Sequence, residues 1–341
     1  MFIETLFKSK RPVYCAASLF SPLSRLGGAH LADTVERILR TSPSYPGDAI
    51  SNYLFLPYRD TNQHEITGPN RARLIYEADI AQLNRSSALL ARLDGLAKDS
   101  GVGMEVGYAF GLGLPTAILV TDFIGEGYLN TEVKWNVDPV INSMADHVHY
   151  KPLHAPSDAT YYQMTLNHEL DAVREFVQGA FAAFDGRGNQ KRPEPPTPVD
   201  KIVYIDCMGG RYQWSRQMHA LIEEEIRQGG FTGQAAQRYT TRTMPDLLKQ
   251  VQRDIEHAME ADIAIFCGDA PELDPGSAAL FGMCAAMGKW TIYQYTSRQA
   301  YKGEGGQEMR VNLMLDQAAS QVTTSIEETI EALRTKLTVP E

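Results

Sequence analysis

The amino-acid sequence predicts two α/β domains in tandem, each built on a parallel sheet. Short apolar, β-prone runs alternate with amphipathic helical patterns, and this series occurs twice along the 341 residues. Between the two series lies "DGRGNQKRPEPPTPVD", whose four prolines and several charges are typical of an extended linker. We therefore expect a first domain at 1–186, a linker at 187–200 and a second domain at 201–341.

The two halves open on the same pair of elements. In the first half "RPVYCAAS" precedes the helical pattern "HLADTVERILR", and in the second half "DKIVYIDC" precedes "QWSRQMHALIEEEIRQ". Further predicted strands are "YLFLP", "ALLARLD" and "TAILVTD", then "ADIAIFCGD" and "KWTIYQY". Because strands that alternate with helices form βαβ units, the strands of each half are expected to be parallel.

The halves also share residues in register. A shift of 175 residues superimposes identical Asp, Gly or Thr residues at seven positions without a gap, which favours an internal duplication over chance. The pairs are Asp79/Asp254, Asp94/Asp269, Asp99/Asp274, Gly101/Gly276, Gly107/Gly282, Gly113/Gly288 and Thr116/Thr291. Glu105 breaks the match, because it falls on Leu280. The halves are expected to share a fold but not this carboxylate.

Composition excludes several classes of function. Acidic residues outnumber basic ones by 42 to 32, for a formal net charge of −10, so a nucleic-acid polymer is not an expected partner. The four cysteines show no CxxC spacing, which argues against a disulfide framework and favours a reducing compartment. No apolar run reaches the ~20 residues of a membrane span, and the N-terminus is unlike a signal peptide. We expect a cytoplasmic protein that binds a small molecule and no membrane.

The segment "HVHYKPLH" is a candidate for a metal site. His147 and His149 have the HxH spacing of some ligand pairs, and His154 follows. The same spacing also places two side chains on one face of a strand, and no carboxylate follows at ligand spacing. We therefore expect neither a metal nor another cofactor.

The segment "DSGVGMEVGYAFGLG", 99–113, carries the strongest functional signal. It follows a predicted strand, so it begins at the carboxyl edge of the sheet, where open α/β sheets bind ligands. A helix from about Val102 would place Glu105 in its first turn, where the helix dipole favours an ionised carboxylate, hence a nucleophile or base. Gly101 and Gly103 would leave room there for a ligand. The spacing GxGxxxG differs from the dinucleotide fingerprint.

Two more carboxylates, Asp79 and Asp99, are candidates for the same site. Several carboxylates together suit glycosyl transfer, because one attacks the anomeric carbon while another handles a proton on the leaving group. The structural alternative is that Glu105 complements the helix dipole, Asp99 caps the helix and Asp79 is solvated.

These residues resemble the nucleoside 2-deoxyribosyltransferase family. "DSGVGMEVGYA" is similar to the family's D-x-G-x-x-M-E-x-G-Y-A segment, which carries the nucleophilic glutamate, here Glu105. "VYCAASLF" is similar to the family's first strand, with Tyr14 and Phe20 at matching positions, and "EADIAQLN" resembles the segment with a base-recognising aspartate, here Asp79. The resemblance covers 12–150 and, more faintly, 201–323.

The resemblance implies a flavodoxin-like (Rossmann-like) fold and a double displacement in nucleoside salvage. Glu105 would attack C1′ of a 2′-deoxynucleoside and hold the sugar as an ester until a free nucleobase attacks the same carbon. Tyr14 would orient Glu105 by a hydrogen bond. Asp99 and Asp79 would hold the base, with one of them protonating it, and Phe20 would pack on the sugar or base.

The resemblance also implies that a second copy completes each site through an asparagine in an "NLM"-like segment. Here "VNLMLDQ" contains Asn312, which would reach the Glu105 site if the halves pack as a pseudo-dimer. Asn142 of "INSMADH" would face the site that lost its glutamate. The alternative for Asn312 is a turn or a helix cap. We expect one active site per chain and assembly of such chains into homo-oligomers.

Two other functions are compatible with these residues. One is hydrolysis of a nucleoside or nucleotide N-glycoside, with water in place of the acceptor base. The other is nucleoside binding without turnover. The residues are compatible with purines or pyrimidines and with deoxyribose or ribose.

Overall fold

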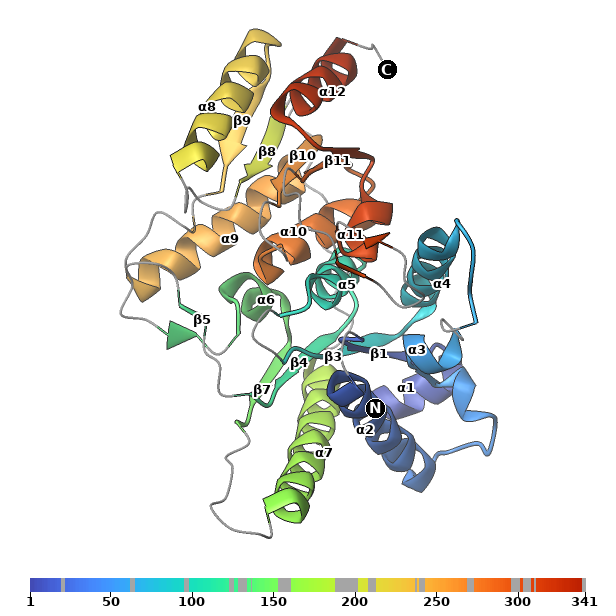
Figure 1. Ribbon diagram of the computed structural model, residues 1–341. Helices are drawn as coiled ribbons and strands as arrows, with labels where there is room; N and C mark the ends of the chain where they lie inside the picture. Colours follow the sequence, from blue (N-terminus) through green and yellow to red (C-terminus); the bar gives the residue numbers. More distant parts are fainter. Residues whose placement is uncertain are drawn as a thin grey trace.

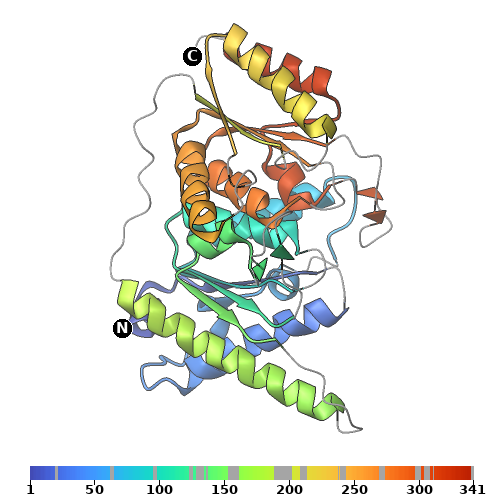
Figure 2. The same cartoon turned by 90° about the vertical axis from the view of Figure 1, so that its left-hand side faces the viewer.

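The protein forms two parallel sheets that face each other across a shared layer of helices (Figures 1 and 2). The computed structural model describes residues 1–19, 22–61, 65–94, 98–122, 126–127, 134–135, 137–152, 161–187, 202–207, 213–236, 238, 243–268, 273–295, 301–302, 308–309 and 311–338. The first half of the chain forms the lower sheet in Figure 1 and the second half forms the upper one.

Both sheets have five strands and the same topology. The first contains β1 (Val13–Ala17), β2 (Leu54–Phe55), β3 (Ala88–Arg92), β4 (Thr116–Val120) and β7 (His147–Tyr150), in the order β2-β1-β3-β4-β7. The second contains β8 (Ile202–Asp206), β9 (Thr232–Ala235), β10 (Ile263–Cys267), β11 (Trp290–Gln294) and β14 (Gln321–Thr323), in the order β9-β8-β10-β11-β14. Counted along each half, both orders read 2-1-3-4-5, which is flavodoxin-like. The predicted fold class is confirmed.

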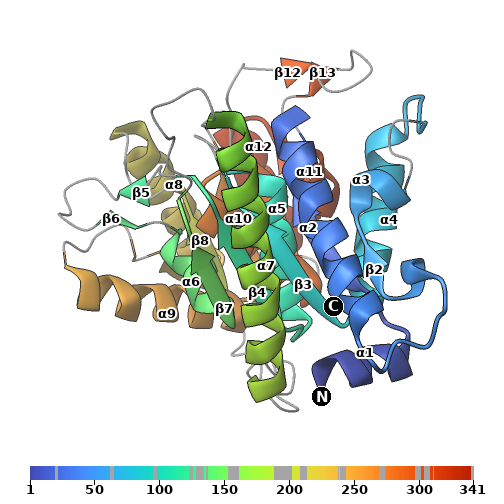
Figure 3. The same cartoon turned by 90° about the horizontal axis from the view of Figure 1, so that it is seen from below.

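Helices cover the outer face of each sheet. On the first sheet these are α1 (Phe2–Ser9), α2 (Pro22–Thr41) and α7 (Tyr161–Arg187), two of which cross the view from below in Figure 3. On the second sheet they are α8 (Gln213–Gln228) and α12 (Ile326–Thr338). Because both faces of each sheet are covered, the central strands β1, β3 and β10 are apolar almost throughout.

The layer between the sheets draws helices from both halves. They are α4 (Arg71–Arg85), α5 (Ser100–Gly111), α6 (Pro139–Met144), α9 (Met244–Glu260), α10 (Pro275–Ala286) and α11 (Leu313–Ala318). One continuous apolar core joins them, and it includes Tyr14 of β1 and Tyr204 of β8. The shorter elements are η1 (Ile50–Asn52), α3 (Pro57–Asp60), and the pairs β5 (Glu126–Gly127) with β6 (Lys134–Trp135) and β12 (Tyr301–Lys302) with β13 (Glu308–Met309).

Helices α5 and α10 make the closest contact between the two halves, and glycine permits it. A Cβ on Gly107 would overlap the carbonyl group of Ala279, and a Cβ on Gly282 would overlap that of Met104. Gly111 lies against Met283 and Ala286 in the same way. Glycine every fourth residue therefore forms a groove along α5 in which the backbone of α10 lies.

Two boundaries differ from the expectation. Helix α5 begins at Ser100, not near Val102, because the Asp99 side chain accepts hydrogen bonds from the amides of Gly101 and Val102 and caps the helix two residues earlier. Helix α7 extends through Arg187, and the rest of the predicted linker lies outside the described residues. Among the helices that the structure describes, none is both long and apolar enough to cross a membrane.

Candidate active site

A pocket opens at the carboxyl edge of the first sheet, between α4, α5 and the start of α11. Its polar lining comes from Asp79, Asp99, Glu105 and Asn312, and its apolar walls include Ile75. The last of the polar residues belongs to the second half of the chain, so both halves form this pocket.

Tyr14 and Glu105 are joined by a short hydrogen bond. Strand alternation turns Val13 and Cys15 to the outer face of the sheet, which leaves Tyr14 pointing inward toward α5. Its hydroxyl donates to Oε1 of Glu105 at 2.6 Å, and both side chains are buried. A hydrogen bond between a neutral donor and a carboxylate in such surroundings fixes the orientation of the carboxylate.

Burial raises the pKa of Glu105 well above its ordinary value of 4.5. The nearby Asp79 charge raises it further, while the Tyr14 hydrogen bond lowers it and the Asp99 charge adds a smaller increase. We expected the helix dipole to keep Glu105 ionised because the sequence placed this residue in the first turn of its helix, and that placement is wrong. Glu105 lies in the second turn of α5, beyond the first turn where the dipole acts strongly.

Asp99 and Asn312 connect the two halves at the pocket. The Asn312 amide donates to Oδ1 of Asp99 at 3.2 Å, while its own Oδ1 accepts from the Met314 amide and caps α11. Asp99 also accepts from the amide of Gly101 at 2.8 Å and from the Ser18 hydroxyl. Burial raises the pKa of Asp99, and these donors oppose that rise. Both residues are therefore helix caps, as the structural alternative held, and both line the pocket.

Asp79 is not solvated. It lies in the middle of α4, is 3 % exposed, and faces the pocket beside Glu105. The structural alternative for Asp79 is therefore wrong. Phe20, expected from the family resemblance to pack on the substrate, lies outside the described residues.

Two predicted site residues lie elsewhere. A Cβ on Gly103 would lie 2.9 Å from the carbonyl oxygen of Pro275, so Gly103 is part of the α5–α10 contact, and Gly101 lines the pocket in its place. Asn142 is exposed on α6, and the residue equivalent to Asn312 is Asp138, the cap of α6. Asp138 lies against Gly276 as Asn312 lies against Gly101. The pairing of Asn142 with the second site was wrong because the helix cap, not the helix body, faces the partner half.

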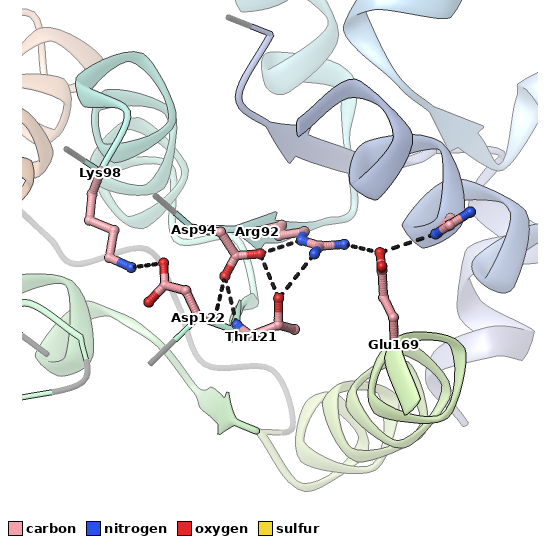
Figure 4. Close-up of polar contacts among 7 residues, drawn as sticks. Arg92, Asp94, Lys98, Thr121, Asp122 and Glu169 are labelled. Carbon is pink, nitrogen blue, oxygen red and sulfur yellow. Dashed lines mark hydrogen bonds and ion pairs between the residues drawn. The ribbon is translucent and has the colours of Figure 1, made fainter. Parts of the chain in front are cut away.

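A partly buried polar network joins the ends of β3 and β4 (Figure 4). Arg92, at the end of β3, donates to Asp94 at 2.5 Å, to Glu169 of α7 at 2.7 Å and to Thr121 at 3.0 Å. Although burial alone would raise the pKa of Asp94, Arg92 and hydrogen bonds from Thr121 hold it below its ordinary value. The Arg92 guanidinium thus ties the ends of β3 and β4 to α7.

Lys98, which directly precedes Asp99, makes a second contact with this region through Asp122. Its ammonium lies 2.6 Å from Asp122, and the residue is 5 % exposed. Sequence reasoning missed both basic residues, although the 175-residue shift placed Cys267 opposite Arg92 and Leu273 opposite Lys98. This contrast was the available signal, because at both positions only the half that contains Glu105 has a basic residue.

The histidine pair lies away from this site. His147 and His149 lie on β7 and face α7, where the His147 ring stacks on Phe176 at 6.1 Å. Burial lowers the pKa of both histidines. His154 lies outside the described residues, and within the described ones no group of three potential ligands could hold a metal ion.

Fold and pocket together define a flavodoxin-like α/β protein with buried carboxylates at the carboxyl edge of its first sheet. Residues 13–138, within the first half of the chain, match the family model described as nucleoside 2-deoxyribosyltransferase. Among solved structures, a 2-desoxiribosyltransferase from Leishmania mexicana is similar over 41 % of this chain and 99 % of its own, with 16 % identity and a TM-score of 0.32. No curated protein matches the chain.

Proposed function

We propose that this protein transfers 2-deoxyribose from a deoxynucleoside to a free nucleobase through a sugar ester on Glu105. The observation that carries the proposal is the 2.6 Å hydrogen bond from Tyr14 to Glu105, in a pocket that also holds Asp79 and Asp99. A buried, oriented carboxylate with acids beside it has the parts that a double displacement at an anomeric carbon requires. The match of residues 13–138 to the family model supports a nucleoside as the substrate.

In the first step an oxygen of Glu105 attacks C1′, and the bond from C1′ to the base nitrogen breaks, leaving its electron pair on the base. Positive charge develops on the sugar as this bond lengthens. That charge stabilises the ionised Glu105 carboxylate, whose pKa burial otherwise raises. The interaction is therefore stronger in the transition state than in the ground state, which is what accelerates the reaction.

The leaving base requires a proton, and an aspartic acid supplies it. Asp99 and Asp79 both line the pocket, and burial raises the pKa of Asp99. In the second step the acceptor base attacks C1′ from the face that the first base left. Its proton passes to the aspartate, and the ester bond to Glu105 breaks. Two inversions retain the configuration at C1′.

The pocket lining favours a nucleoside over a nucleotide. None of the described residues that line it is Lys or Arg, whereas a 5′-phosphate is usually bound by such side chains. The nearby Lys98 is already paired with Asp122. Nucleoside salvage is the corresponding role.

The experiment is a chromatographic assay of products. Wild type, Glu105→Gln and the control Glu77→Gln are each incubated with a deoxynucleoside, with and without a second free base. Glu77 is a half-exposed carboxylate on α4 that pairs with Arg73, so its loss leaves the pocket intact. We expect a new nucleoside from wild type and the control, and a loss of about 10⁴-fold or more in Glu105→Gln.

Mass spectrometry of acid-quenched protein then tests for a deoxyribosyl ester on the peptide that contains Glu105. Free base and sugar released at a rate independent of the acceptor would instead indicate an N-glycoside hydrolase. Binding without turnover of any purine or pyrimidine deoxynucleoside would indicate a nucleoside-binding protein.

The second half has a supporting role in this proposal. It contributes Asn312 to the pocket, and its Leu280 stands where a nucleophile would be needed, so one active site per chain is proposed. Origin of the halves by duplication, with domains at 1–186 and 201–341, fits the shared topology. Assembly of these chains into homo-oligomers stays a prediction.

A further inference from the structure

The second domain contains counterparts of the residues that surround Glu105. Strand register aligns Val13 with Ala88 in the first sheet and Val203 with Ile263 in the second, so Tyr204 takes the place of Tyr14. Helices α5 and α10 have the same length and both begin after an aspartate cap, so Asp274 takes the place of Asp99.

Helices α4 and α9 complete the correspondence. Asp79 and Asp254 both lie six residues before the end of their helix, at Arg85 and Glu260 respectively. Three of the residues around the first pocket thus recur in the second domain, around a fully buried Leu280 in place of Glu105.

A guanidinium group lies among these counterparts. Arg238, which follows β9, is 0 % exposed. It donates to Asp206 at 2.8 Å, to Ser277 at 2.7 Å and to Asp254 at 3.1 Å, and it lies 3.4 Å from the Tyr204 hydroxyl and 3.9 Å from Asp274. An arginine side chain from the same chain therefore occupies the position where the first domain has its pocket.

Two of its partners are polar only in this domain. Asp206 stands where β1 has Ala16, and Ser277 stands where α5 has Val102. Both are fully buried, and both accept hydrogen bonds from Arg238. Burial of a polar group costs free energy unless the group has a hydrogen-bond partner. The Arg238 guanidinium is such a partner for Asp206 and Ser277, which explains why polar residues occur at these two buried positions.

We propose that the second domain's former pocket is a guanidinium site that Arg238 fills as a built-in ligand. The site is thereby closed to a nucleoside. Its carboxylates form ion pairs with the arginine, which also holds the start of α10 through Ser277 and Asp274. Helix α10 packs on α5 through contacts such as Pro275 against Gly103, so Arg238 supports the helix that carries Glu105.

The test removes the built-in ligand and supplies it from solution. Arg238→Ala leaves buried carboxylates without their cation, so its Tm is expected to fall by on the order of 5–10 °C. Methylguanidinium, at concentrations far below denaturing ones, should then bind one equivalent per chain by calorimetry and restore most of the lost Tm. Urea, its neutral analogue, and methylammonium, a cation without the planar fork, should not.

The matched control is Arg334→Ala. Arg334 makes a two-point contact with Glu225 on the exposed surface, so its removal leaves no enclosed cavity. The proposal is overturned if methylguanidinium stabilises Arg238→Ala no more than Arg334→Ala or wild type. If Arg238→Ala fails to fold, refolding is compared in methylguanidinium and methylammonium, and equal failure in both counts against the proposal.

A second measurement tests the closed site directly. Calorimetric titration of the Glu105→Gln chain with a deoxynucleoside should give one site per chain, and two sites would overturn the proposal. Absence of any nucleoside binding would instead count against the proposed transferase function, because the methylguanidinium result does not depend on that function.

Discussion

The side-chain amide of Asn312 donates a hydrogen bond of 3.2 Å to Oδ1 of Asp99, across 213 positions of sequence and from one domain to the other. Its own carbonyl oxygen simultaneously caps α11 through the Met314 amide. The Asn312 side chain thus connects helix α11 of the second domain to the Asp99 carboxyl group of the first. The pocket is complete only when the two halves pack as they do in this chain.

Replacement of Asn312 by Ser separates its two roles. Serine is a good helix cap, so α11 should remain, but the shorter side chain loses the contact with Asp99. We expect kcat/KM to fall about 10- to 100-fold, the cost of taking one hydrogen-bond partner from a buried polar group, with little change in Tm. The control is Asp138→Ser, which alters the equivalent cap of α6 against Gly276. Equal losses of kcat/KM in the two variants would show that the change of helix cap, and not the lost contact with Asp99, lowers the activity.

Removal of the Tyr14 hydroxyl should shift the pH profile. The hydrogen bond from Tyr14 lowers the pKa of Glu105, so Tyr14→Phe raises that pKa further. Since Glu105 attacks in its ionised form, the acid limb of kcat should move to higher pH by about one unit. Stopped assays between pH 4 and 9 measure the shift. An acid limb that stays in place, or moves to lower pH, would contradict the assignment.

Glu105→Gln should stabilise the protein in a pH-dependent way. The folded pKa of Glu105 is raised above its ordinary value of 4.5, so the native state retains a proton that the unfolded chain releases. The free energy of unfolding of wild type therefore declines as pH rises from about 4.5 to the folded pKa. The variant lacks this loss and should gain at least ~1 kcal/mol at pH 8 and almost nothing at pH 4. Urea unfolding at both pH values measures the difference, which should disappear if Glu105 titrates normally.

Gly107→Ala tests the contact between α5 and α10. The added methyl would overlap the carbonyl group of Ala279, so one helix must move away from the other. We expect a loss of about 3 kcal/mol or more in the free energy of unfolding, together with loss of activity. The control is Gly186→Ala on α7, where a Cβ meets no atom within 4 Å and alanine should gain up to ~1 kcal/mol. Similar stabilities of the two variants would exclude the close contact.

Lys98→Leu tests the network in Figure 4 by giving the first domain the residue that the second has at Leu273. The residue directly before Asp99 then loses its contact with Asp122. We expect kcat/KM to fall about 10-fold, because misplacement of a positioned group is costly even when it is small. Arg73→Leu, which removes an exposed pair with Glu77 on α4, should leave kcat/KM unchanged. An unaltered rate in Lys98→Leu would show that Asp99 holds its position without this ion pair.

The central glycines show where sequence reasoning reached its limit. Five glycines surround Glu105, and clearing space for a ligand was a sound local interpretation of them. In the structure Gly101 lines the pocket, whereas Gly103, Gly107 and Gly111 lie against α10. The spacing of four residues indicates one helix face, but it does not say whether that face meets a ligand or another helix. The answer depends on residues 275–286, which are distant in sequence.

The amino-acid sequence by itself determined the class of fold, the equivalence of the halves and the distinct character of Glu105. These follow from local patterns: strand and helix periodicity, the 175-residue register, and the single carboxylate that breaks it. Only the tertiary structure decided that Asp138 matches Asn312, that Arg238 lies among Asp206, Asp254 and Ser277, and that burial raises the pKa of Glu105. Each of these depends on which atoms meet across the interface and how much water they exclude, and both arise when the two halves pack together.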